Sequence, residues 1–195
     1  MKVFVVYCHP SEKSFTYNVY NNFLKGLKAS GHEVVVSDLY KMNFKSDISE
    51  EEYLKETFYR ADIPVKDDVK LEQEKIQSSD AIVFIYPVFW TEAPAKLVGW
   101  FDRVWSTGFA YNPSPQMKVL DKALVIACAG KSLETLSITG EKMAMETVML
   151  GDRIRNRAKE KQMVILDNIT HWNEELREVK QPVHLVQAYK LGFDF

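Results

Sequence analysis

The chain has only two cysteines in 195 residues. Cys8 and Cys128 form neither a CxxC pair nor the spacing of a zinc site, and no two histidines have ligand spacing, so no metal centre is expected. If these cysteines end the first and fourth strands of a sheet with the third strand between them, they lie roughly 9.6 Å apart. A disulfide spans about 7 Å between Cα atoms, so we predict two buried thiols in a reducing compartment.

Long apolar runs and an excess of one charge are also absent. No apolar stretch approaches the ~20 residues of a membrane span, and Met1–Tyr7 enters a strand-like segment without a signal-peptide pattern. The 25 basic and 27 acidic residues give a net charge of -2 and form no basic face that would attract nucleic acid or an anionic membrane. We therefore expect a cytoplasmic protein that neither inserts into a membrane nor binds nucleic acid.

Glycine is missing from the first loop that could hold a phosphate. The segment Cys8–Thr16 contains none, which excludes the GxGxxG dinucleotide turn and the GxxxxGK[ST] P-loop, because both need glycine for a close approach of the backbone to phosphate. The chain also lacks a GxSxG elbow, which disfavours a hydrolase with a serine nucleophile. An anion at this loop would instead meet hydroxyls, His9, Lys13 and the N-terminus of a helix.

The sequence does contain an alternation of strand-length apolar runs with helical patterns. The runs are apolar on both faces, as a parallel sheet covered by helices requires, and all but the last are followed by a helical pattern. We predict a single α/β domain over residues 1–195, a doubly wound three-layer sandwich around a five-stranded parallel sheet of order 2-1-3-4-5. The predicted strands are Val3–Tyr7, Val34–Val36, Ala81–Tyr86, Ala123–Ala129 and Met163–Leu166.

Capping residues mark the expected helices. The helix Thr16–Lys28 stops before Gly31, which suits a C-cap, and Pro94 suits the first turn of a helix over Ala95–Trp105. A third helix is predicted over Glu141–Lys161.

The stretch Lys41–Lys66 breaks the alternation. Within it Ser49 is predicted to cap a helix whose first turn holds the acidic run Glu50-Glu51-Glu52. We interpret that run as solvated and not catalytic.

Three loops are predicted to form one ligand site, because ligands of an open α/β sheet bind beyond the carboxyl ends of the strands, near the switch in winding direction. The loop Cys8–Thr16 suits a phosphate. The loop Pro87–Thr91 carries two large aromatic residues on which a planar ring could stack, and Cys128–Lys131 offers small residues and backbone donors. Each of these features also has a plain structural interpretation when it is taken singly. The first loop could simply cap a helix, His9 could be a hydrogen-bonded structural histidine, and the aromatic residues could belong to a core or an interface.

A series of motifs runs in a specific order and spacing over roughly Lys2–Gly140. Its members are His9-x4-Ser14-Phe15, Ser37-Asp38-Leu39-Tyr40-x-Met42-Asn43-Phe44, Glu72-Gln73, Tyr86-Pro87-x2-Trp90, Pro94-Ala95-x-Leu97-x-Gly99-Trp100-Phe101-Asp102-Arg103-Val104 and Phe109-Ala110-Tyr111. In these motifs the chain resembles the NAD(P)H:quinone oxidoreductases, the DT-diaphorase-like branch of the flavodoxin superfamily.

The resemblance implies a flavodoxin-like fold and a homodimer with a flavin, FAD, in each of two sites at the subunit interface. It also implies ping-pong hydride transfer from NAD(P)H through the flavin to a quinone. Tyr111 matches an aromatic residue that, in the family, reaches the substrate pocket of the neighbouring subunit. The implied flavin-binding residues are His9, Ser14, Phe15 and Thr16 around the phosphates and ribityl chain, Gln73 near the same end, Pro87, Val88, Phe89 and Trp90 along the isoalloxazine, and Cys128, Ala129, Gly130 and Lys131 at its pyrimidine side.

The sequence departs from the best-known members at two positions. Where they carry a tyrosine and a histidine facing the flavin, this chain has Leu136 and Lys142, so a relay through histidine is not expected. Backbone donors at Gly130 and Lys131 could stabilise charge on the reduced ring instead. Lys142 could add a cation there, although a lysine at the start of an amphipathic helix more often faces solvent. Tyr111 and Lys142 are therefore only weak candidates for catalytic roles.

The region after Gly151 is shorter than in the larger members that hold FAD with C-terminal residues, so FMN is the alternative cofactor. We predict a flavin-dependent NAD(P)H dehydrogenase that reduces a quinone or similar aromatic acceptor. The alternative is a flavin-binding regulatory subunit of a potassium-efflux transporter, a role that similar proteins have. A one-electron carrier of flavodoxin type is disfavoured, because the chain lacks both a strongly acidic surface and the Ser/Thr-x-Thr-Gly-x-Thr phosphate loop.

Overall fold

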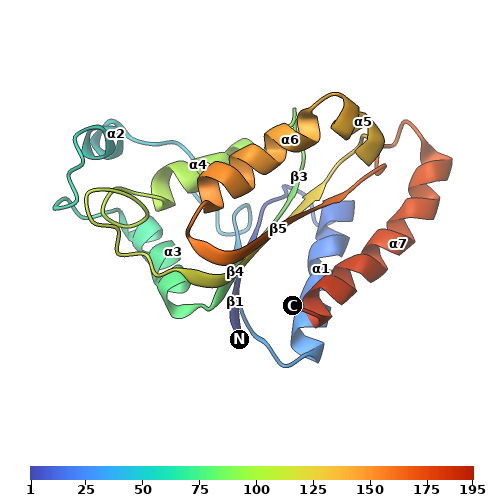
Figure 1. The fold of residues 1–195 in the computed structure, drawn as a ribbon, viewed down its shortest axis with the longest axis horizontal. Helices are drawn as coiled ribbons and strands as arrows, with labels where there is room; N and C mark the ends of the chain where they lie inside the picture. The colour runs from blue at the N-terminus through green and yellow to red at the C-terminus, as the bar shows by residue number, and fades with distance from the viewer.

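Five parallel strands form the central sheet of the computed structural model, which describes residues 1–195. Their order is β2-β1-β3-β4-β5 (Figure 1), so the predicted topology is confirmed. The central strand β3 is buried along its whole length, which explains why its sequence is apolar on both faces. The strands are β1 (Lys2–Tyr7), β2 (Glu33–Asp38), β3 (Ala81–Pro87), β4 (Leu120–Cys128) and β5 (Ala158–Leu166).

Helices cover both faces of the sheet (Figure 1). Val3, Val5 and Tyr7 of β1 pack on the face covered by α1 and α7, whereas Phe4 and Val6 point into the larger core on the other face. No helix combines the length and apolar composition that crossing a membrane requires. The helices are α1 (Phe15–Ala29), α2 (Glu50–Thr57), α3 (Asp67–Ser78), α4 (Ala95–Val104), α5 (Leu133–Ile138), α6 (Glu141–Glu146) and α7 (Glu174–Phe193), with a π-helical segment at Thr147–Ile154.

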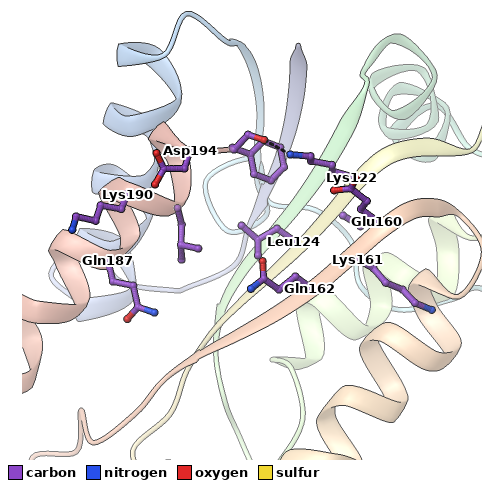
Figure 2. A pocket seen from close by; sticks show the side chains of 11 residues that line it. Lys122, Leu124, Glu160, Lys161, Gln162, Gln187, Lys190 and Asp194 are labelled. Atoms are coloured by element: carbon purple, nitrogen blue, oxygen red, sulfur yellow. Dashed lines mark hydrogen bonds between the residues drawn. The ribbon is translucent and has the colours of Figure 1, made fainter.

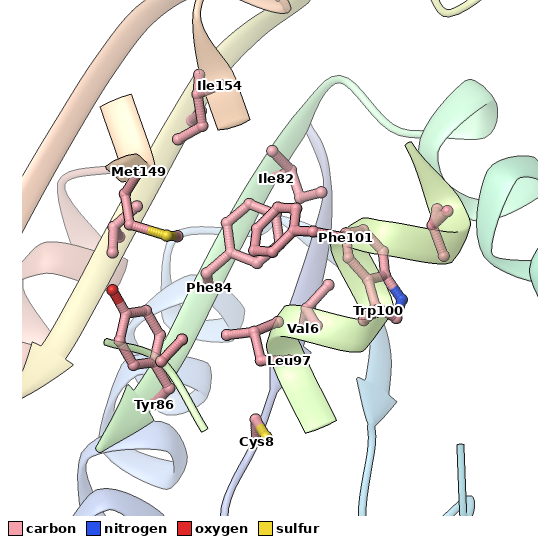
Figure 3. Packing of buried hydrophobic residues seen from close by; sticks show 14 of the residues in the cluster. Val6, Cys8, Ile82, Phe84, Tyr86, Leu97, Trp100, Phe101, Met149 and Ile154 are labelled. Carbon is pink, nitrogen blue, oxygen red and sulfur yellow. The ribbon is translucent and has the colours of Figure 1, made fainter. Parts of the chain in front are cut away.

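The larger core fixes α4 against β3. Figure 3 shows Phe84 of β3 beside Phe101 and Trp100 of α4, and the ring centroids lie 4.9 Å and 5.6 Å apart, respectively. Cys8 points into the same cluster, and both cysteines are buried free thiols, as predicted. The loops that connect these elements therefore start from rigid ends.

The helix expected over Glu141–Lys161 is too long. The π-helical segment ends at Ile154, Arg155 adopts a positive φ of 47°, and Ala158–Lys161 are the first residues of β5. This half of β5 is polar because it is an edge strand whose charged side chains face solvent, and such charges protect a sheet edge from pairing with another chain. The charged residues concealed the strand from a reading based on apolar runs.

The expectation that no helix follows the last strand is wrong. The 20-residue helix α7 follows β5 and packs beside α1. The buried face of α7 consists of His184, Ala188 and Gly192. The helix also contains Pro182, which is exposed. Small or polar residues form this buried face, so it lacks the large apolar side chains by which the core-facing side of an amphipathic helix is recognised.

The acidic run at the start of α2 is only partly solvated. Ser49 caps the helix as predicted, and its capping box with Glu52 is complete. Glu52, however, is 15% exposed and lies 2.7 Å from the guanidinium of Arg103 in α4, so the interpretation of the whole run as solvated is wrong. A buried arginine requires a carboxylate partner. Here the partner Glu52 comes from a segment 51 residues away in the sequence.

Two glycines allow α1 and α7 to approach closely. A Cβ on Gly26 would lie 2.1 Å from the carbonyl oxygen of Tyr189, and a Cβ on Gly192 would lie 2.2 Å from that of Phe23. Both obstacles are backbone atoms of the facing helix, so a side chain at either position would force the helices apart.

We expect Gly26→Ala to lower the free energy of unfolding by about 3 kcal/mol, because overpacking outweighs the better helix propensity of alanine. Chemical denaturation measures the change. Gly151→Ala is the matched control, since the nearest atom to its Cβ lies 3.9 Å away, and it should be neutral or slightly stabilising. Equal effects of the two substitutions would contradict the close packing of α1 on α7.

Candidate functional site

The loops after β3, β4 and β5 surround a cleft at the carboxyl edge of the sheet. The cleft has a volume of about 680 Å³, within the range of sites that bind cofactors and other small ligands. Leu136, buried in α5, and Glu141 of α6 complete its wall. The lining residues are Val88, Trp90, Thr91, Ala129, Gly130, Lys131, Ser132, Thr135, Leu136, Glu141, Asn168, Thr170, Trp172 and Asn173.

The loop after β4 presents unused backbone donors to the cleft. The amides of Gly130 and Lys131 have no acceptor within the chain, and Gly130 is exposed. The Lys131 ammonium lies 2.6 Å from Glu141, and its hydrogen bond to that carboxylate lowers the pKa of Glu141. The loop therefore offers two free N–H groups beside an ion pair, an arrangement that can stabilise developing negative charge.

The loop after β3 is held in a strained turn. Trp90 and Thr91 have φ values of 51° and 67°, and paired backbone hydrogen bonds of 2.8 and 2.9 Å join Phe89 to Glu92 across the turn. Turns with two left-handed residues usually contain glycine or asparagine. A tryptophan and a β-branched threonine at these positions therefore raise the free energy of the folded backbone. The turn leaves the Trp90 indole fully exposed, so this residue contributes nothing to the core.

Thr91→Gly is expected to raise the free energy of unfolding by about 1 kcal/mol, because glycine adopts a positive φ without strain. Urea denaturation would detect this gain. Thr135→Gly is the control, because Thr135 lies in α5 with a helical backbone, and there the same change should lower stability. A loss of stability in both variants would show that the turn is not strained.

The loop after β1 ends at the N-terminus of α1, where backbone donors have no partner in the chain. Ser14 caps α1 by accepting a hydrogen bond of 3.0 Å from the amide of Tyr17, and the amides of Phe15 and Thr16 have no acceptor in the chain. The Tyr7 hydroxyl is buried without a partner next to Ser14, and burial raises the pKa of Tyr7, so the phenol keeps its proton. Free amides and unpaired hydroxyl hydrogens suit a phosphate.

His9 stands at the entrance of this loop. Its Nδ1 atom lies 2.9 Å from the backbone nitrogen of Ser11, which leaves the Nε2 edge free. Burial lowers the pKa of His9, so the ring is neutral near pH 7 and would contribute a hydrogen bond without charge.

The cleft and the α1 N-terminus are neighbours. The Thr16 hydroxyl faces the Cys128 thiol, and Cys128 directly precedes Ala129 in the wall of the cleft. The combined donor set, a wide cleft with free amides next to an anion-binding helix start, fits a planar ring system that carries a phosphate on a short chain.

The structure does not bring every predicted residue to this place. Gln73 lies in α3, where its amide donates to the Val104 carbonyl and the Ser106 hydroxyl at 3.0 Å, away from the three loops. The Cys128 side chain is buried in the core on the α1 side, and Phe89 is exposed without lining the cleft. The resemblance implied a place for Gln73 near the flavin, whereas within one chain its amide joins α3 to the end of α4.

The two candidates for catalysis also lie outside the cleft. Tyr111 donates a hydrogen bond of 2.6 Å to Glu56, and burial together with that carboxylate raises the pKa of Tyr111. Lys142 is 42% exposed and lies 3.5 Å from Glu146. Within one chain, neither side chain reaches the wall of the cleft.

The residues that the sequence analysis missed belong mainly to the loop after β5. Asn168, Thr170, Trp172 and Asn173 line the cleft, and Asp167 anchors their loop by accepting a hydrogen bond of 3.0 Å from the amide of Leu133. The order of the strands could have predicted this loop as part of the site. All strands of a parallel sheet end at the same edge, so the loop after the fifth strand must also lie there.

Comparisons with known proteins agree with this architecture. The family model of the flavodoxin-like fold matches residues 1–152. A solved structure of an NAD(P)H:quinone oxidoreductase from Methanothermobacter marburgensis is 41% identical, with a TM-score of 0.92, and the match covers 100% of this chain and 96% of that one. An FMN-dependent NADH-azoreductase from Bacillus anthracis, solved in complex with FMN, shares the fold with a TM-score of 0.65 at 15% identity, covering 98% and 100% of the two chains.

Among the curated relatives, rat NAD(P)H dehydrogenase [quinone] 1 is 36% identical over 124 residues, which cover 57% of this chain and 45% of the rat protein. The match thus spans about half the length of that relative. The matched family model, the full-length structural match and the cleft at the carboxyl edge agree with one another. The chain therefore belongs to the NAD(P)H:quinone oxidoreductase family of flavodoxin-like proteins.

Proposed function

We propose that this chain is a flavin-dependent NAD(P)H dehydrogenase that transfers two electrons, in ping-pong fashion, from NAD(P)H to a quinone or similar aromatic acceptor. The observation that carries the proposal is the position of the cleft beside the α1 N-terminus, where a ring site and a phosphate site meet. The names of the matched relatives from Methanothermobacter marburgensis and rat support the same activity.

Different residues of the chain would hold the phosphate and the ring of a flavin. Ser14, Phe15 and Thr16 would hold the phosphate, and Val88 and Trp90 would flank the ring. When bound, the flavin supplies the ability to accept a hydride from one substrate and release it to another. The amides of Gly130 and Lys131 would act as fixed donors toward negative charge at the ring edge, a role that needs no histidine.

We propose FAD as the cofactor and retain FMN as the alternative. Arg177 of α7 follows the cleft residues Trp172 and Asn173 by one turn, and the buried Nε of this arginine has no partner. Arg177 is the first cation of α7, and its guanidinium pairs with Glu174 at 2.8 Å, so a second phosphate would compete with that carboxylate for it. Chromatography of flavin released from the purified protein distinguishes FAD from FMN directly.

We also propose that the protein is a homodimer with its flavin sites at the interface. Tyr53, Phe58 and Tyr59, in and just after α2, are 57%, 67% and 56% exposed, and the Tyr59 ring lies 6.4 Å from Tyr111. A second copy would cover this aromatic surface and place Tyr111 near the neighbouring site. Sedimentation of Phe58→Glu against the unmodified chain tests the interface, and an unchanged dimer would argue against it.

Residues 1–195 are proposed to act as one flavin-binding domain in the cytoplasm, where both free thiols would remain reduced. None of the relatives described above is named as a transporter subunit, so the regulatory alternative has no support from them.

Anaerobic stopped-flow absorbance of the flavin-loaded protein tests the activity. Rapid bleaching of the flavin band on addition of NADH or NADPH, followed by recovery on addition of a quinone, is the expected result, and it also identifies the preferred donor. A bound flavin that neither nucleotide reduces would overturn the proposed dehydrogenase activity.

A further inference from the structure

The outer face of α7 carries an apolar stripe that nothing in the chain covers. Val179, Val183, Val186 and Phe193 are 68%, 60%, 57% and 48% exposed and follow one another at helical spacing. They lie opposite the buried face that packs on α1, and α7 forms one edge of the molecule (Figure 1). An exposed apolar stripe of this kind on a charged surface indicates a contact with another helix.

Two opposite charges lie on either side of the three valines: Glu175 precedes Val179 by one turn, and Lys190 follows Val186 by one turn, before Phe193. Glu175 and Lys190 are both exposed, and neither forms an ion pair within the chain. They lie about 22 Å apart along the helix axis at 1.5 Å per residue, so they cannot pair with each other. Figure 2 shows that Lys190 points away from Lys122 and Glu160, the residues on the opposite wall of the 560 Å³ cleft beside α7.

We propose that α7 packs antiparallel against α7 of a second copy of this chain, about a two-fold axis between Pro182 and Val183. In this register Val179 of each copy faces Val186 of the other, and Glu175 faces Lys190. The same ion pair therefore forms twice, once at each end, as a self-complementary two-fold contact requires. A parallel arrangement would instead place like charges opposite one another.

The contact is separate from the aromatic surface around α2, so it would join proposed dimers into tetramers, or monomers into dimers if the proposed dimer does not form. One helix pair buries less than a standard interface, so we expect weak, concentration-dependent association. It does not depend on flavin binding, and the stripe contains no residue that lines the flavin cleft.

Charge reversal tests the register. In sedimentation velocity of the full chain over a range of concentrations, Glu175→Lys and Lys190→Glu alone should each raise the dissociation constant of this association at least tenfold. The double variant should restore it, because the pairs re-form with reversed signs. The proposal would be overturned if the single variants sedimented like the unmodified chain, or if the double variant associated as weakly as the single variants. Flavin reduction measured in parallel should not change in any variant.

Cysteine cross-linking tests the axis independently. Val183→Cys lies next to its own copy across the axis and should form a disulfide-linked dimer under mild oxidation. Val179→Cys is the matched control, since about 10.5 Å along the axis separates it from its own copy, which a disulfide cannot span. The native cysteines are buried and do not interfere. Cross-linking of both variants at equal rates, or of neither, would overturn the antiparallel arrangement.

Discussion

Replacing Arg103 by methionine is expected to lower the free energy of unfolding by about 3 kcal/mol at pH 7. The Arg103 side chain is 3% exposed and lies 2.7 Å from Glu52 and 2.6 Å from Asp68. It also donates a hydrogen bond of 2.8 Å to the Lys45 carbonyl. Methionine fills similar volume but leaves both half-buried carboxylates without their cation, and chemical denaturation would measure the loss.

The same substitution should change the dependence of stability on pH. The hydrogen bond from Arg103 lowers the pKa of Asp68, so this pair stabilises the folded state above the ordinary aspartate pKa of about 3.9. That contribution is lost as the pH falls through the lowered pKa. The difference in the free energy of unfolding between the unmodified chain and Arg103→Met should therefore be largest near pH 7 and should shrink below pH ~4.

Arg60→Met serves as the control for this experiment. Arg60 pairs with Asp62 at 2.7 Å, but both side chains are more than half exposed, so loss of this pair should change the free energy of unfolding little. If Arg103→Met were as mild as Arg60→Met, or if its effect did not depend on pH, the Arg103 cluster would not join α2 to α4 as we describe.

Ser14→Asp is expected to raise the dissociation constant for FMN or FAD by about 100-fold, while the stability of the protein remains almost unchanged. Aspartate caps a helix as well as serine, so the hydrogen bond to the Tyr17 amide can be kept. The new carboxylate would repel a phosphate at the α1 N-terminus, by roughly 4 kcal/mol at 4 Å before screening by salt. Quenching of flavin fluorescence measures the binding.

Riboflavin, which lacks the phosphate, is the control ligand for this prediction. Its affinity should change less than threefold, because only the ring site would hold it. An equal loss of affinity for riboflavin and FMN would place the phosphate elsewhere, or would show that the substitution distorts the loop. Ser49→Asp, at the cap of α2, adds the same charge away from the site and should leave flavin binding unchanged.

The site could be predicted as far as its loops, but not in the contacts of each residue. The segments Cys8–Thr16, Pro87–Thr91 and Cys128–Lys131 follow strands whose carboxyl ends must share one edge, so their convergence follows from the order of the strands. The position of Gln73 did not follow, because its amide is used by the end of α4. The strained turn at Trp90 was also hidden, since neither Trp90 nor Thr91 is a residue that favours a positive φ.

The sequence alone determined the parallel sheet and its order. Strands that are apolar on both faces must be covered by helices on both sides, and right-handed crossovers leave few topologies open to such a chain. Only the tertiary structure decided the close approach at Gly26, the partners of Arg103 and the place of α7. These features join residues far apart along the chain through backbone contact or buried charge, and such pairings leave no trace in the local periodicity from which elements are recognised.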